Sequence, residues 1–147
     1  MKILLAVDGS KHSLAAVQAL IRHADWYRER PSVEVVTVHL PVPSFHNMSV
    51  VISKPQIERY YREEGELRMA EAGQKLAAAG IPCTQRVLVG PVAERIIEHA
   101  AQTRCDLICM GSRGLGNIGR ALLGSVATKV LHLAKVPVLL ANERSKS

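Results

Sequence analysis

The chain of 147 residues is poor in aromatic side chains, which make up 3% of it. Proteins that bind single-stranded nucleic acid need clustered aromatic residues beside positive charge. The charge itself is present, because 19 Lys and Arg against 13 Asp and Glu give a formal net charge of +6, but the positive residues are scattered along the sequence. We therefore expect this surplus to favour a small anionic ligand rather than a nucleic acid.

Long hydrophobic runs are also missing. A membrane-spanning helix needs about 20 apolar residues, and no segment of the sequence reaches that length. The apolar run at the N-terminus ends at Asp8, short of the roughly 7 to 15 residues in the core of a signal peptide. The sequence therefore predicts a cytoplasmic protein with no membrane partner, and its length and 48% hydrophobic content predict one domain over residues 1–147.

Cysteines are few, and the three present, Cys83, Cys105 and Cys109, do not have the spacing of a metal site. Cys105 and Cys109 are predicted on one face of the same strand, about 13 Å apart, which is too far for a disulfide. We expect buried free thiols. The sequence also shows no cluster of metal ligands and no Ser-His-Asp set, so it predicts no protein metal site and no catalytic residues.

Five apolar segments alternate with four helical patterns. The strands are predicted at residues 2–7, 33–40, 82–89, 106–110 and 136–141, and the helices begin at residues 13, 55, 91 and 126. The first helix is expected to end at Pro31 and the second at Gly80. This alternation predicts an α/β fold with a doubly wound parallel sheet.

Three stretches differ from this regular pattern. Residues 41–54 form a connection longer than the usual ~2 to 6 residues, and residues 142–147 form a polar tail. The helix that begins at residue 55 has a charged face, including Arg68, which we expect to meet solvent. Gly65 and Gly73 inside that helix predict a bent or loosely packed segment.

Half of the ten glycines lie between residues 111 and 124, after the strand at 106–110 and before the last helix. Such a loop lets backbone N–H groups approach an anion, and the following helix N-terminus adds further donors. It is not a P-loop, because Ser125-Val126 stands where Lys-Ser or Lys-Thr is required. A dinucleotide fingerprint with glycines at 114, 116 and 119 lacks the acidic residue expected about 20 positions later.

Gly111, Gly114, Gly124 and Ser125 match the pattern G-2x-G-9x-G-[ST]. With this pattern the chain resembles the universal stress protein family, in particular its ATP-binding members. The resemblance implies a five-stranded parallel sheet in the order 3-2-1-4-5 with helices on both faces. It also implies a small regulatory protein of the stress response that binds ATP, alone or with Mg²⁺, at the switch point between the first and fourth strands.

The family's nucleotide-lining positions fall on eight residues. They are Asp8, Val38, Met110, Gly111, Gly114, Gly124, Ser125 and Val126. Asp8 has an alternative role in closing an Asx turn, and Ser125 in capping a helix. Arg113 and Arg120 lie in the loop and could contact phosphate or face water. His39 and His46 are predicted at the surface or in turns, not as general bases.

Two other classes of function fit the same sheet. One is a nucleotide-dependent enzyme that hydrolyses ATP slowly or adenylates a substrate, although residues 8–13 lack the S-G-G-x-D-S pattern of adenylating enzymes. The other is an interaction protein whose crevice stays empty.

The last strand is predicted at the sheet edge and carries four uncharged apolar residues, Val136, Val138, Leu139 and Leu140. Family members commonly pair through this strand, so we expect a homodimer.

Overall fold

The computed structural model describes residues 1–43, 52–114 and 123–143 of the chain. Five parallel strands form one sheet in the order β3-β2-β1-β4-β5, which confirms the predicted order. The strands are β1 (Lys2–Ala6), β2 (Ser32–His39), β3 (Cys83–Val89), β4 (Leu107–Gly111) and β5 (Val138–Ala141). β5 begins later than predicted, so Val136 precedes the strand and packs against the core.

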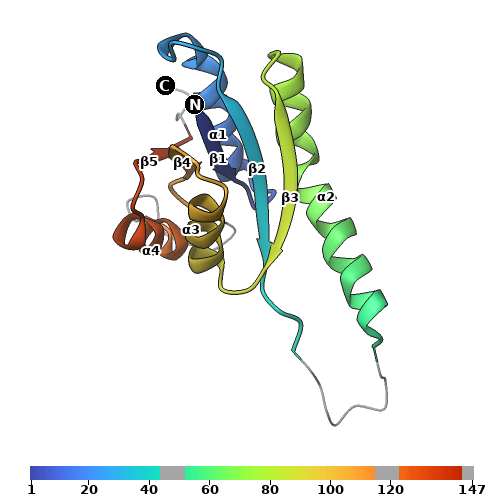
Figure 1. Ribbon diagram of the computed structural model, residues 1–147. Coiled ribbons are helices and arrows are strands. Elements are labelled where there is room, and N and C mark those ends of the chain that lie inside the picture. The colour runs from blue at the N-terminus through green and yellow to red at the C-terminus, as the bar shows by residue number, and fades with distance from the viewer. Residues whose placement is uncertain (44–51, 115–122, 144–147) are drawn as a thin grey trace.

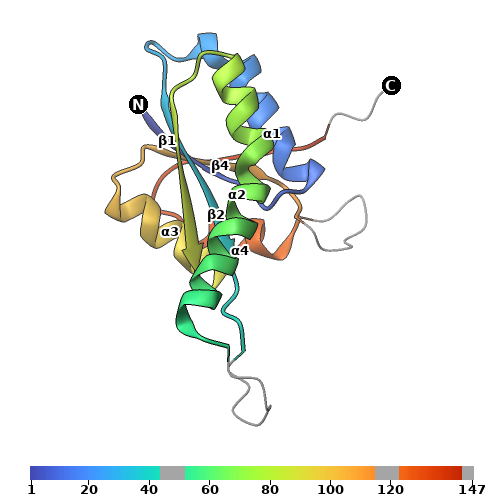
Figure 2. The same ribbon diagram turned by 90° about the vertical axis from the view of Figure 1, so that its right-hand side faces the viewer.

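Helices cover both faces of this sheet, as Figure 1 and Figure 2 show. α1 and α2 lie on one face, and α3 and α4 lie on the other. The helical segments are α1 (Lys11–Arg22), the short 3-10 helix η1 (Ala24–Trp26), α2 (Lys54–Ala78), α3 (Val92–Gln102) and α4 (Ser125–Leu133). Since strands covered on both sides are apolar at successive positions, this arrangement explains the continuous apolar runs and confirms the α/β prediction.

Each face of the sheet has its own apolar core, because successive strand residues point to opposite sides. Leu5 belongs to the cluster under α1 and α2, and its neighbour Leu4 belongs to the cluster under α3 and α4. Cys109 lies in the first cluster and Cys105 in the second, so the prediction that they share a face is wrong. Both are buried free thiols, as expected, whereas Cys83 is a free thiol that is only half-buried. Burial raises the pKa of Cys109 to about 12.

The first helix begins and ends earlier than predicted. Ser10 is its N-cap, since Ser10 Oγ accepts a hydrogen bond from the Ser13 N–H at 3.1 Å, and Ser13 therefore lies inside the first turn. The helix ends at Arg22, and η1 follows before the proline that was expected to stop it. In η1 the ring of Trp26 stacks on His23 with 3.8 Å between centroids, and Trp26 remains 77% exposed.

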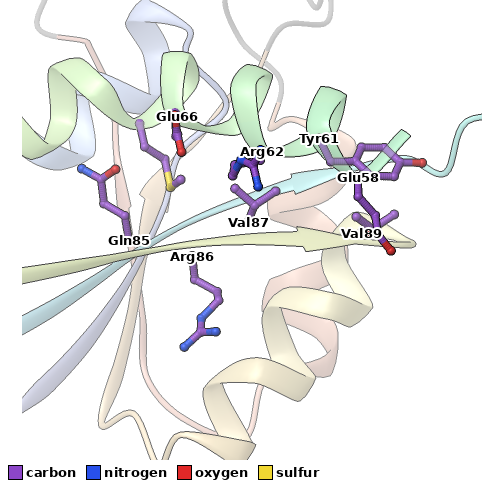
Figure 3. Close-up of a pocket in the computed structure, with 9 residues that line it drawn as sticks. Glu58, Tyr61, Arg62, Glu66, Gln85, Arg86, Val87 and Val89 are labelled. Carbon is purple, nitrogen blue, oxygen red and sulfur yellow. The ribbon is translucent and has the colours of Figure 1, made fainter. Parts of the chain in front are cut away.

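Two glycines bring α2 close to the edge strand β3. A Cβ on Gly65 would lie 2.3 Å from Val87 Cγ2, and a Cβ on Gly73 would lie 2.3 Å from Gln85 Nε2. Figure 3 shows both strand side chains on the side of β3 that faces α2. Both glycines are buried, so the prediction of a loosely packed helix is wrong. Because these two glycines have no side chains, the side chains of Val87 and Gln85 on β3 can pack directly against the backbone of α2.

A buried charged cluster joins β2 to α3 near the amino ends of the strands. Glu34 is 6% exposed, and its two carboxylate oxygens lie 3.1 Å from Lys2 Nζ and 2.9 Å from His99 Nε2. Burial acts to raise the pKa of Glu34, but the hydrogen bonds and charges of His99 and Lys2 outweigh it and lower the pKa below its usual value. The carboxylate therefore contributes to stability while it is ionised.

We expect Glu34→Gln to lower the free energy of unfolding at pH 7 by about 1 to 3 kcal/mol, because it weakens charge-assisted hydrogen bonds to Lys2 and His99. A carboxylate with a lowered folded pKa contributes fully above its unfolded pKa, about 4.3, and loses that contribution as pH falls through the folded value. The stability gap between wild type and variant should therefore stay constant from pH 7 to about pH 5 and shrink as the pH falls further toward about pH 3. Urea unfolding across this range measures it.

The matched control for that measurement is Glu98→Gln, which removes a carboxylate from the surface pair with Arg95. The Glu98 side chain is 55% exposed, so its loss should cost less than about 1 kcal/mol. Equal losses for the two variants, or a gap that stays constant with pH, would contradict the role assigned to Glu34.

Candidate functional site

A crevice opens at the carboxyl ends of the central strands, where α1 leaves β1 toward one face of the sheet and α4 follows β4 on the other. All eight residues predicted to line a nucleotide line this crevice: Asp8, Val38, Met110, Gly111, Gly114, Gly124, Ser125 and Val126. Arg113 lines it as well, while Arg120 lies outside the described residues. The switch point of the sheet thus brings segments from both ends of the chain together.

Asp8 uses its two carboxylate oxygens in different ways. Oδ1 accepts a hydrogen bond from the Ser10 N–H at 2.9 Å, which forms an Asx turn. Oδ2 lies toward the glycine loop, since a Cβ built on Gly114 would be 2.8 Å from it. Gly9 completes the turn with φ +81°, a left-handed conformation that glycine adopts without steric cost. The two roles considered for Asp8 are compatible, because one oxygen shapes the turn and the other faces Gly114.

Gly111 and Gly124 do not have a positive φ, so backbone conformation does not explain why glycine stands at these positions. The close approach of neighbouring backbone atoms explains it, because a side chain would crowd them. A Cβ on Gly111 would lie 2.6 Å from the His12 carbonyl oxygen, so this glycine packs the end of β4 against α1. A Cβ on Gly124 would lie 3.3 Å from Arg113 Cα. The Gly124 N–H donates to the Ser112 carbonyl at 2.8 Å and is therefore used inside the protein.

The N-terminus of α4 is the part of the crevice best suited to an anion. Gly124 is the N-cap residue, and it has no side chain that could accept from the first N–H groups of the helix. Ser125 is the first helical residue, not the N-cap, and it is exposed at the crevice. The first N–H groups of a helix lack intrahelical acceptors and carry a partial positive charge. Such a terminus binds phosphates and carboxylates.

The other end of the crevice is apolar. Val38 and Met110 are 9% and 7% exposed and belong to the core cluster under α3 and α4, where Val126 packs against them. Val92 and Ile96 of α3 line the same region. An apolar lining with a few polar groups is typical of sites that bind small molecules.

The crevice residues that were not predicted from the sequence include His39, Tyr60 and Arg68. His39 was expected at the surface or in a turn, but it is 4% exposed, because α2 covers the end of β2. Its ring centroid lies 5.4 Å from that of Tyr61 and 6.2 Å from that of Tyr60. Arg68 was expected to face solvent and instead lines the crevice. The signal in the sequence that could have pointed to this part of the crevice was the adjacent pair Tyr60 and Tyr61, since the chain has few aromatic residues.

The imidazole of His39 is electrostatically coupled to Arg68. Burial lowers the pKa of His39, and the positive charge of Arg68 lowers it further. The charge of Glu64 and a backbone interaction with Tyr61 act in the opposite direction but are weaker. The ring is therefore neutral near pH 7, and Arg68 carries the positive charge on this side of the crevice.

The connection after β2 borders the crevice where it begins. Pro41, Val42 and Pro43 line the crevice, and the Val42 N–H donates to the Tyr61 hydroxyl at 2.7 Å. Of the predicted loop at 41–54, residues 44–51, including His46, lie outside the described residues. The loop's last residue already belongs to the first turn of α2.

The C-terminal segment returns to the start of α1. The Ser112 hydroxyl donates to Asn142 Oδ1, and Glu143 lies 4.0 Å from Lys11 Nζ. The rest of the predicted tail, residues 144–147, is not among the described residues.

In the described ranges, no helix combines the length and apolar character needed to cross a bilayer. Nor do those ranges bring together three or more His, Cys, Asp or Glu side chains as metal ligands.

Comparison with known proteins gives a consistent result over nearly the whole chain. The model of the universal stress protein family matches residues 1–142. The chain is 34% identical over 139 residues to a universal stress protein of Thermus aquaticus, and the match covers 94% of this chain and 96% of that protein.

Solved structures agree with the sequence comparison. The hypothetical protein MJ0577 of Methanocaldococcus jannaschii is similar with a TM-score of 0.78 and 26% identity, over 99% of this chain and 97% of that one. A universal stress protein solved in complex with cAMP shares the fold with a TM-score of 0.66 and 24% identity, over 97% of this chain and 96% of that one.

Proposed function

Since this chain belongs to the universal stress protein family, we propose that it binds an adenine nucleotide, preferentially ATP, in the crevice between β1 and β4. The uncapped N-terminus of α4 at this crevice is the observation that carries the proposal. The phosphates would accept hydrogen bonds from the first N–H groups of α4 and from the Ser125 hydroxyl. The protein would act as a small nucleotide-binding regulatory module, with residues 1–147 as one domain.

The apolar end of the crevice supports placing the base there. Val38, Met110 and Val126 offer a buried apolar surface of the kind that a purine ring can cover. Asp8 would contact the ribose side, and Gly114 and Gly124 would let the phosphates approach the backbone. A protein of the same fold is described with cAMP, which is also an adenine nucleotide.

We expect ATP to bind at least about tenfold more tightly than AMP, because each additional charge-assisted hydrogen bond that the protein donates to a phosphate oxygen contributes about 1.5 to 3 kcal/mol. No lysine of the Walker type is present, so Mg²⁺ would strengthen the interaction by neutralising the β- and γ-phosphates. Calorimetric titration with ATP, ADP, AMP and NAD, each with and without Mg²⁺, measures this. Equal or tighter binding of AMP would contradict the assignment to ATP.

We further propose that two copies pair through β5. In the sheet, β5 pairs with β4 alone and forms one edge. Leu139 is 37% exposed there, while Val138 and Leu140 pack partly against the core. An apolar edge strand without charges presents unpaired N–H and C=O groups to another chain. Val136 lies before the strand and would contribute to the core instead of the pairing.

A further inference from the structure

We propose that Arg68 is a further phosphate contact of the crevice, one that the glycine signature does not include. The proposal rests on the nucleotide binding proposed above and adds the chemistry of the wall formed by α2. This α2 wall consists of Tyr60 and Arg68 of α2 together with His39 at the end of β2, and all three line the crevice. Arg68 would bind phosphate through its guanidinium, and His39 would sense the charge that arrives there.

The backbone of the β1–α1 turn holds the stem of Arg68 in place. A Cβ built on Gly9 would lie 3.2 Å from Arg68 Cγ and 3.4 Å from Arg68 Cα, so the arginine lies directly against the turn that follows Asp8. The side chain is only partly exposed, because its methylene groups cover this turn. Arg68 is thereby kept beside the crevice and away from the outer surface of α2.

Arg68 also lacks the ion pair that its position on the helix would allow. Glu64 is four residues earlier in α2, a spacing that usually favours a salt bridge. Two other pairs with this spacing form in the same helix: Lys54–Glu58 and Lys75–Glu71. Within the described ranges no carboxylate lies within 4.0 Å of the Arg68 guanidinium. Its charge is therefore available to a ligand in the crevice.

His39 is 4% exposed, and its Nε2 is buried without a hydrogen-bond partner among the described residues. Buried polar atoms are nearly always paired, so an unpaired one in a crevice wall indicates that a ligand or water completes the site. The groups that face this ring are Tyr60, Tyr61, Glu64 and Arg68, all from α2. Of these, Arg68 alone carries a positive charge.

A guanidinium binds phosphate through two parallel hydrogen bonds, and phosphate is the chemistry that nucleotides supply. The phosphate could come from the 5′ chain of ATP or from a phosphorylated ribose hydroxyl, as in adenosine 3′,5′-bisphosphate. Both sources would place the same group beside Arg68. The experiment below distinguishes them.

Calorimetry with wild type and Arg68→Gln should compare adenosine, AMP, ATP and adenosine 3′,5′-bisphosphate. We expect Arg68→Gln to weaken binding of ATP or of the bisphosphate on the order of tenfold and to leave adenosine unchanged. A loss for ATP alone assigns the contact to the 5′ chain, and a loss for the bisphosphate alone assigns it to the ribose. Unchanged affinities, or an equal loss that includes adenosine, would overturn the proposal.

The matched control is Arg62→Gln in the same helix. Figure 3 shows Arg62 at the separate hollow between α2 and β3, with Glu58, Glu66 and Val87, and it does not line the crevice. Its substitution removes the same charge from α2, so it should leave all four affinities within about twofold of wild type. If both arginine variants weaken ATP binding equally, the effect is one of net charge and the assignment to Arg68 is wrong.

The pKa of His39, followed by NMR of its ring, distinguishes a phosphate contact from a structural role of Arg68. If Arg68 only supported the fold, the pKa of His39 would not change when ATP binds. In wild type a bound phosphate should offset the charge of Arg68 and raise the pKa of His39. In Arg68→Gln the pKa should already be higher without ligand and should change less on binding. If ATP binds to wild type but the pKa of His39 stays constant, the inference about Arg68 is overturned and the proposed nucleotide binding is not. A wild type that binds no adenine nucleotide overturns the proposed function as well.

Discussion

Gly114→Val is expected to lower the affinity for ATP by at least about a hundredfold while the fold survives. A Cβ at this position would already lie 2.8 Å from Asp8 Oδ2, so the larger side chain must displace the carboxylate and occupy the crevice. The position itself is a partly exposed loop with no left-handed backbone requirement. Calorimetry with ATP measures the loss, and circular dichroism with thermal unfolding tests the fold.

Two variants make this experiment specific. Gly124→Val should also abolish binding, because its side chain would press on the backbone at Arg113 and disturb the start of α4. Ala101→Val introduces the same residue at an exposed position of α3 outside the crevice and should bind ATP normally. If Gly114→Val and Gly124→Val both bind ATP like wild type, the glycine loop has a structural role only.

Leu139→Lys is expected to convert the protein from a dimer to a monomer. It places a charge in the middle of the apolar edge strand β5, and inward or edge charges prevent strands from pairing with another chain. A two-fold operator would bring the two copies of this lysine near each other and repel them. Light scattering after size exclusion at micromolar concentration should give wild type twice the chain mass of 16.0 kDa.

The control for the dimer is Leu67→Lys, since Leu67 is 72% exposed on α2, far from β5 in the strand order. It should keep the wild-type mass. A wild-type mass of one chain would refute pairing through β5, as would a Leu139→Lys protein that remains dimeric.

Most of the phosphate side of the crevice could be predicted from the sequence, because local patterns determine it. An apolar run that ends at Asp8 and another that ends at Gly111 define two strand ends, and the switch-point rule then places them side by side. The strand order is confirmed, and with it the proximity of Asp8 to Gly114. Their contacts with a nucleotide stay a prediction.

The α2 wall could not be predicted, because it depends on how one helix is rotated against the sheet. Periodicity places Arg68 on a charged face of α2 but does not reveal that this face meets the turn at Gly9. The rotation follows from packing in which Gly65 and Gly73 fit against β3, and the sequence alone suggested weakness at these glycines. For the same reason His39 was expected at the surface, although α2 buries it.

The crevice is built from segments that lie near opposite ends of the chain, and this couples ligand binding to global folding. Asp8 and Gly114 become neighbours only when β1 and β4 have paired, so the unfolded chain retains no partial site. A ligand that binds the native state alone adds about 2.7 kcal/mol to the unfolding free energy at a hundred times its Kd. For a domain of this size that corresponds to a rise in Tm of about 5 to 10 °C. A rise in the nucleotide concentration would therefore raise the temperature at which the protein unfolds.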